Sequence, residues 1–265
     1  MKRAAIQRLV PYEADYNRLS KYRKIGTWGL WTISACTVIL PVLNYFSTNA
    51  VAQTIYNVIN FLYFLIIIFY YILNIYTETF LYPATARKRR KGFIDNSLGS
   101  KFLEKPVEGY YTNDKLSQGP YKMIVNCAEN CYFTKSIAKA MIPQIIVKNV
   151  LCGLAFLTIA YIGIKDSLVA IPILQILLST LFFTELVHHI NFIEKLEQLF
   201  EQFKTFFINK PNEQQLLQEA VLFFLDYETT LAYNKAPLSD AVYERLNEQL
   251  SKEWEELKDR YEIYK

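Results

Sequence analysis

Five consecutive cations are the clearest chemical feature of the sequence: Arg87, Lys88, Arg89, Arg90 and Lys91. Aromatic, amide and further basic side chains follow them: Phe93, Asn96, Tyr110, Tyr111, Asn113 and Lys115. Clustered cations bind phosphate and aromatic rings stack on bases, so the composition suits a nucleotide or a single-stranded nucleic acid. A basic run beside a membrane span also attracts anionic lipid, by about 1 kcal/mol per charge, and this alternative stays open.

Polar side chains interrupt a long apolar run upstream of the cations: Asn60, Tyr63, Tyr70 and Asn74. Their spacings of three, seven and four residues place them on one face of a helix. An amide in hydrocarbon costs several kcal/mol unless it is paired, so this face is expected to contact protein or water. The face either lines a pore or gate, or forms hydrogen bonds between helices of about 0.6–2 kcal/mol each.

Two ionisable residues lie at the end of the last long apolar run. Glu185 and His189 are four residues apart, so they are expected to face each other across one helical turn. Repeated around a symmetry axis, they would form part of a gate that selects cations. The alternative is that they anchor the end of the helix at the membrane surface. Lys148, near the start of the third run, is expected to extend to the cytoplasmic interface.

Motifs that mark common enzymes are absent from the sequence, including a P-loop, a dinucleotide-binding glycine motif and a zinc-protease helix. A zinc site needs about four ligands, and the two histidines, His188 and His189, are distant in sequence from Cys127 and Cys131. We therefore expect a protein that is not an enzyme and that holds neither a metal nor a cofactor.

Four apolar runs, each long enough to cross a bilayer, must position these residues: 25–46, 55–77, 142–164 and 167–187. At 1.5 Å per residue, each run covers about 30 Å of hydrocarbon as a helix. Residues 25–77 contain no Asp, Glu, Lys, Arg or His, and a soluble core helix rarely needs so long an uncharged stretch. The sequence therefore predicts an integral membrane protein with several spans.

Short connections join the first run to the second and the third to the fourth, so each pair is expected to form a hairpin. Seven Lys and Arg residues precede the first run and eleven lie in residues 83–140, and such charge marks the cytoplasmic side. The predicted fold is an all-α integral membrane protein with four transmembrane helices and both termini in the cytoplasm. Its segments are a cytoplasmic arm and helix (1–24), a transmembrane hairpin (25–77), a basic cytoplasmic segment (78–141), a second transmembrane hairpin (142–187) and a cytoplasmic helical bundle (188–265).

Helices are also predicted outside the spans. The basic segment is expected to be a loop that leads into a helix before the third span. After the fourth span, apolar residues at alternating spacings of three and four predict a helix that packs through one seam: Ile193, Leu196, Phe200, Phe203 and Phe207. Residues 210–212 should end this helix, a second should cover about 213–233, and Ser239 should cap a third.

Three sequence blocks around the basic run resemble one family: RRKGFIDNSLGSKF at residues 89–102, GYYTND at 109–114 and NCAENCYFT at 126–134. They are similar to the cytoplasmic signature of the SMODS-associated, four-transmembrane, pore-forming effectors of bacterial anti-phage defence, the Hailong group. The resemblance covers about residues 20–190 and does not extend to the C-terminal helices.

The resemblance implies a homo-oligomeric ion channel, such as a tetramer, that depolarises the infected cell from the bacterial inner membrane in abortive infection. A nucleotidyltransferase encoded nearby would make the gating signal, a nucleotide or a short single-stranded DNA such as an oligodeoxyadenylate. The family blocks add Asn126 and Asn130 to the expected ligand-binding residues. They also imply an N-terminal plug, for which residues 1–10 offer Ile6, Leu9 and Val10; an arm lying flat on lipid is the alternative.

A function of a different class stays open, a membrane scaffold that conducts no ions and recruits a partner through its cytoplasmic helices. The apolar seam with Phe203 and Phe207 and the acidic last helix suit such a role. Ion flux through purified protein in liposomes distinguishes the two functions, because a scaffold gives no flux.

Overall fold

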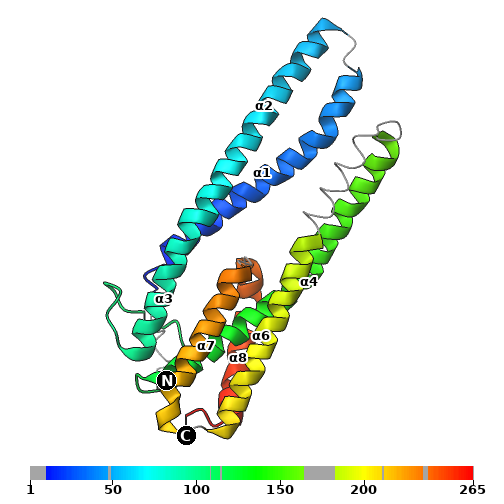
Figure 1. Cartoon of the computed structure of the whole chain (residues 1–265). Helices are drawn as coiled ribbons and strands as arrows, with labels where there is room; N and C mark the ends of the chain where they lie inside the picture. The colour runs from blue at the N-terminus through cyan, green and yellow to red at the C-terminus, as the bar shows by residue number, and fades with distance from the viewer. Residues whose placement is uncertain are drawn as a thin grey trace, which may run out of the picture. The chain divides into compact units, whose positions relative to one another are not determined.

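The computed structural model describes residues 10–46, 49–107, 109–113, 115–163, 183–210, 212–234 and 238–264. These residues form helices and connections without a β-strand among them, which confirms the all-helical prediction for the described ranges (Figure 1). The chain divides into two compact units, Met1–Asn96 with Ser100–Tyr110, and Ser97–Gly99 with Tyr111–Lys265. Most of the fourth predicted span and the predicted plug residues Ile6 and Leu9 lie outside the described residues.

A helical hairpin forms most of the first unit. Helix α1 (Glu13–Phe46) runs antiparallel to α2 (Ala50–Ile75) (Figure 1). The Asn49 side chain caps α2 by accepting a hydrogen bond of 2.8 Å from the Ala52 N–H. The less exposed positions of α2 recur every three or four residues, as packing against another helix requires. Two of the four predicted apolar runs thus form paired helices.

Helix α2 continues into a longer helix. A π-helical turn, η1 (Tyr76–Leu81), joins it to α3 (Tyr82–Leu98) without a break (Figure 1). Pro83 has no N–H to donate to the carbonyl four residues earlier, and a wider turn is one way in which a helix accommodates this. Among the described residues, the combined helix Ala50–Leu98 is the one that is long and apolar enough to cross a membrane, judged by length and composition. Its most apolar part is almost entirely exposed, which is unfavourable in water and favourable in lipid.

The basic run lies on a helix, and the expectation of a loop there is wrong. Arg87 and Lys91 lie in the middle of α3, which ends where Gly99 takes a φ of +74°. Lysine and arginine are good helix formers, and extending an existing helix is far easier than starting a new one. The five cations therefore continue the helix that begins with α2.

Residues before α1 pack onto the loop that follows α3. Val10 and Tyr12 are buried in one cluster with Val107, and Leu103 packs at its edge. Gly92 of α3 makes this close approach possible, because a Cβ there would lie 2.7 Å from Cε1 of Tyr12 and 2.9 Å from Cγ2 of Val107. Val10, one of the predicted plug residues, is thus part of the packing of this unit.

Replacing Gly92 with alanine should strain this cluster. The added methyl group would approach Tyr12 and Val107 more closely than real Cβ atoms do, and overpacking of this kind typically costs about 1–3 kcal/mol. Thermal unfolding of the purified protein in detergent should show a lower midpoint for Gly92→Ala than for the wild type. Gly26→Ala is the matched control, because a Cβ at Gly26 meets nothing within 4 Å. A midpoint for Gly92→Ala at or above that of the control would contradict the tight packing.

The second unit contains the helices α4 (Pro120–Gly163), α6 (Phe183–Asn209), α7 (Glu213–Asn234) and α8 (Asp240–Arg260). Helix α4 packs against the other three (Figure 1). The predicted seam on α6 is confirmed, because all five of its residues are buried. The predicted cap of α8 is confirmed as well, because the Ser239 side chain accepts a hydrogen bond of 3.4 Å from the Val242 N–H.

Single helices run through the boundaries that the composition suggested between segments. Helix α1 passes through the predicted boundary at residue 24, the helix Ala50–Leu98 through the one at 77, and α4 through the one at 141. Stretches of membrane-like and of cytoplasmic composition therefore share the same helices.

Candidate functional site

A buried polar cluster connects α4 with the residues that precede it. Asn113 and Asn126 are fully buried, and Nδ2 of Asn113 donates a hydrogen bond of 2.9 Å to Oδ1 of Asn126. The same Nδ2 donates to Oε2 of Glu129 at 2.6 Å. Nδ2 of Asn126 donates to Oγ of Ser97, also fully buried, at 3.0 Å. The four side chains thus bind one another away from water.

Lys258 of α8 brings a positive charge into this cluster. Its side chain is almost completely buried, and its Nζ donates to Oγ1 of Thr112 at 3.1 Å and to Oη of Tyr264 at 2.5 Å. It also donates to a carboxylate oxygen of Glu255. A buried ammonium group is costly unless it is paired and hydrogen-bonded. These partners, together with the carboxyl group of Glu129, therefore make its burial possible.

Glu129 changes its charge near neutral pH. Burial raises the pKa of its carboxyl group to about 7, while Lys258, Asn113 and Thr112 act to lower this pKa. The folded-state pKa lies above the ordinary value of 4.5, so the stability that this group contributes is present at low pH and is lost as the pH rises through 7. The protonated carboxyl group is therefore the form that favours the folded chain.

The residues predicted to bind a ligand are divided between the two units. The second unit holds five of them: Tyr111, Asn113, Lys115, Asn126 and Asn130. Tyr111 is buried, and its hydroxyl accepts a hydrogen bond of 3.2 Å from Nδ2 of Asn130. The ammonium group of Lys115 lies 5.4 Å from the ring centre of Tyr264. Since these side chains bond within the chain, their direct contact with a ligand stays a prediction.

The cations of α3 differ in their surroundings. Lys88 donates to Oδ2 of Asp15 in α1 at 2.7 Å. Arg89 and Arg90 are half-buried, whereas Arg87 and Lys91 are exposed. Two other predicted ligand residues, Asn96 and Tyr110, belong to the first unit and also have structural contacts. Nδ2 of Asn96 donates to the carbonyl of Val107 at 3.3 Å, and the ring of Tyr110 lies edge-on to the ring of Tyr12.

The predicted polar face of α2 is divided by its packing against α1. Tyr63 and Tyr70 are half-buried, and a Cβ at Gly29 of α1 would lie 3.6 Å from Cδ2 of Tyr70. Asn60 and Asn74, by contrast, are exposed. The tyrosines thus belong to the less exposed face of α2, and the asparagines point elsewhere.

Two further amides of α2 belong with these asparagines. Gln53 and Asn57 are exposed as well. Gln53 lies four residues before Asn57, and Asn57 lies three residues before Asn60. Together with Asn60 and Asn74 they fall within about 100° of the helix circumference. We call Gln53, Asn57, Asn60 and Asn74 the amide stripe. The spacing of Gln53 and Asn57 from Asn60 was the signal that could have identified them from the sequence.

Glu185 and His189 do not bond to each other, and the expected pair across one turn is wrong. The carboxylate of Glu185 accepts hydrogen bonds of 2.6 and 2.5 Å from Nζ of Lys148 on α4. His189 is buried, and its Nε2 lies 2.8 Å from the carbonyl oxygen of Ala138. Each residue thus has a partner on α4, and the partner of Glu185 is Lys148.

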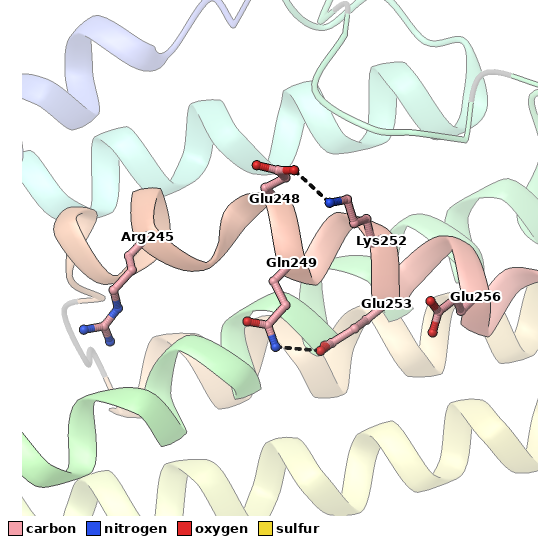
Figure 2. A pocket seen from close by; sticks show the side chains of 6 residues that line it. All are labelled: Arg245, Glu248, Gln249, Lys252, Glu253 and Glu256. Atoms are coloured by element: carbon pink, nitrogen blue, oxygen red, sulfur yellow. Dashed lines mark hydrogen bonds and ion pairs between the residues drawn. The ribbon is translucent and has the colours of Figure 1, made fainter.

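A shallow groove of about 510 Å³ on α8 was not expected from the sequence (Figure 2). Six side chains of this helix line it: Arg245, Glu248, Gln249, Lys252, Glu253 and Glu256. Figure 2 shows the pairs Lys252–Glu248 and Gln249–Glu253, each joined at 2.8 Å. The hydroxyl of Tyr132 also donates to Glu253, which lowers the pKa of that carboxyl group. Much of the charge in the groove is therefore compensated within the unit.

No protein-family model, curated protein or solved structure matches this chain. Its function therefore has to be inferred from the described geometry and from the family that the sequence blocks resemble. The membrane-length helix, the amide stripe and the exposed cations of α3 are the features that bear on it.

Proposed function

We propose that the chain is a membrane effector that assembles with copies of itself into an ion channel. A nucleotide or single-stranded oligodeoxynucleotide from a partner nucleotidyltransferase gates the channel, and opening depolarises the bacterial cell during anti-phage defence. Four helices then cross the inner membrane as two hairpins, with both termini in the cytoplasm. The resemblance to the Hailong group and the distribution of Lys and Arg support these statements.

The amide stripe of α2 is the observation that supports a channel most directly. An unpaired amide in hydrocarbon costs several kcal/mol, and three exposed amides of the stripe, Asn57, Asn60 and Asn74, lie within the predicted span 55–77. A second copy of the chain can cover them, because an amide both donates and accepts and so pairs with its own kind. Copies arranged around an axis would place the stripe between neighbouring helices or toward a central path of water.

Ion flux in liposomes tests this proposal. The purified full chain, reconstituted with a potassium-sensitive dye inside the vesicles, should conduct ions, and added single-stranded oligodeoxyadenylate should change the rate. Light scattering in detergent should give the mass of an oligomer. Protein that inserts into the vesicles but gives no flux, with or without the oligonucleotide, would contradict the channel.

A second candidate function, a scaffold that conducts no ions, is favoured by the exposed side of α7. Leu217, Val221 and Leu225 follow one another at four-residue spacing, and each is more than two-fifths exposed. An apolar row on a helix is a surface on which a partner helix can dock. The same flux measurement distinguishes this function from the channel.

A further inference from the structure

Two lysines of α1 have no ionic partner in the described part of the chain. Lys21 and Lys24 are exposed and form no ion pair with a described residue. Arg23, which lies between them, is neutralised instead, because its Nε and Nη2 donate hydrogen bonds of 2.9 and 3.2 Å to the carboxylate of Glu78. Lys21 and Lys24 project about 160° and 100° around the helix from Arg23. The positive charge of the two lysines is therefore uncompensated.

Two exposed tryptophans continue the same side of α1. Trp28 is 74% exposed and Trp31 is 48% exposed, whereas the third tryptophan of the chain, Trp254, is 1% exposed. Spacings of three, four and three residues relate the two lysines and the two tryptophans, so their side chains project within about 80° of the helix circumference. We call Lys21, Lys24, Trp28 and Trp31 the lysine–tryptophan row.

The row lies on the side of α1 that faces away from α2. Gly29 marks the packed side, because a Cβ there would lie 3.6 Å from Cδ2 of Tyr70. Tyr22 packs on that side as well, with its ring edge-on to the ring of Tyr76 and 5.9 Å between the ring centroids. Gly29 and Tyr22 project about 120° and 140° from the middle of the row. Packing within the hairpin therefore leaves the row uncovered.

The order of the row along α1 matches the layers of a bilayer. In the proposed topology, the hydrocarbon around the first span begins at the end of α1, at Phe46. Trp28 then lies about 27 Å along the helix axis, Lys24 about 33 Å and Lys21 about 38 Å. The hydrocarbon is about 30 Å thick, and the polar layer on each side adds about 5–8 Å. Trp28 therefore lies at the boundary that tryptophan prefers, and both lysines lie among the headgroups.

On the basis of the proposed function, in which α1 crosses the membrane, we infer that the lysine–tryptophan row binds anionic phospholipids of the cytoplasmic leaflet. The ammonium groups of Lys21 and Lys24 contact the headgroup phosphate. The ring of Trp28 packs against the glycerol and the upper acyl chains, and Trp31 packs against the chains about one turn deeper. A zwitterionic lipid satisfies the row less well, because the cation of its own headgroup offsets the phosphate charge.

Quenching of tryptophan fluorescence by brominated lipids tests this inference with the full chain in nanodiscs. Trp254 is buried and should add a constant background to the signal of the two exposed tryptophans. The bilayer is phosphatidylcholine with a minor share of phosphatidylglycerol, and the acyl chains of one lipid or the other carry the bromine. The quenching should show a preference for phosphatidylglycerol of up to about fivefold for each lysine. Bromines near the headgroup should quench more than bromines near the chain ends.

Replacing Lys21 and Lys24 together with glutamine should remove most of this preference, because both uncompensated charges are lost. Quenching in pure brominated phosphatidylcholine should stay unchanged, since the tryptophans are still present. Lys101→Gln with Lys105→Gln is the matched control, because it removes two exposed lysines of the same unit that lie outside the row. This control should keep the preference of the wild type.

Equal quenching by the two brominated lipids in the wild type would overturn the inference. The same preference in the Lys21/Lys24 variant and in its control would exclude the row as the source. Tryptophans that neither lipid quenches would show that protein covers the row, and stronger quenching by bromines near the chain ends would contradict its depth. A preference for phosphatidylglycerol without ion flux would overturn the channel but not the lipid surface. Ion flux without that preference would overturn the lipid surface alone.

Discussion

Replacing Asn60 and Asn74 together with leucine should abolish ion flux in liposomes. Both asparagines are exposed on an apolar helix of membrane length, so in lipid they need a partner from another copy or from water. Leucine is stable in contact with hydrocarbon and removes that need. Flux at matched protein density should therefore fall to the level of empty vesicles.

The oligomeric state of the same variant distinguishes the two roles of the amide stripe. Dissociation into monomers in detergent would show that the amides join the copies, at about 0.6–2 kcal/mol per hydrogen bond. An intact oligomer without flux would show that they line the path of the ions. Phe61→Leu with Ile75→Leu is the matched control, because these exposed neighbours change shape without changing polarity. Flux at the wild-type rate in the asparagine variant would exclude both roles.

Replacing Lys258 with methionine should lower the free energy of unfolding more at pH 8 than at pH 5, by up to about 1.4 kcal/mol, because Glu129 can take up a proton when its cation is lost. At pH 8 the carboxyl group of Glu129, whose pKa is about 7, is mostly charged, and the substitution leaves it without its buried cation. At pH 5 the same group is protonated and needs no cation. Chemical unfolding in detergent at the two pH values measures the difference.

Glu129→Gln provides the second half of this test. The substitution removes a carboxyl group that is unfavourable when charged, so the loss of stability between pH 4.5 and 7 should shrink. In the double variant with Lys258→Met, the part of the lysine variant's penalty that appears only at pH 8 should be recovered. Glu256→Gln is the control, since Glu256 is exposed on α8. A lysine variant equally destabilised at both pH values would show that Glu129 and Lys258 are not coupled.

Local patterns in the sequence predicted the helices of the second unit well. The seam from Ile193 to Phe207 and the cap at Ser239 depend on the spacing of neighbouring residues and on one side chain, and such signals need no tertiary context. The prediction of a loop at Arg87 was wrong because charge indicates that a segment contacts water and does not indicate whether the segment is helical. A preceding helix that can extend into the cations decides that question.

Tertiary partners explain the rest of what the sequence left open. Tyr70 and Asn60 project about 80° apart around the helix, and α1 packs near Tyr70, so one is half-buried and the other exposed. Lys258 follows the buried Leu250 and Trp254 at four-residue spacing, which places it on their side of α8, but its charge by itself predicts exposure. Its partners Thr112 and Glu129 lie more than a hundred residues away in sequence, where no periodicity can point to them.

The helix that continues from α2 through η1 to α3 is about 74 Å long. A continuous helix transmits rotation along its axis. In the proposed channel, a ligand that rotates α3 at Arg87 would therefore also rotate Asn60 and Asn74 about the same axis. The π-helical turn η1 holds about one more residue per turn than the α-helix on either side of it. If η1 became α-helical, α3 would rotate about the helix axis relative to α2. In the proposed channel, rotation about the axis of this one helix, rather than a bend between domains, would then couple the cations of α3 to the amides of α2.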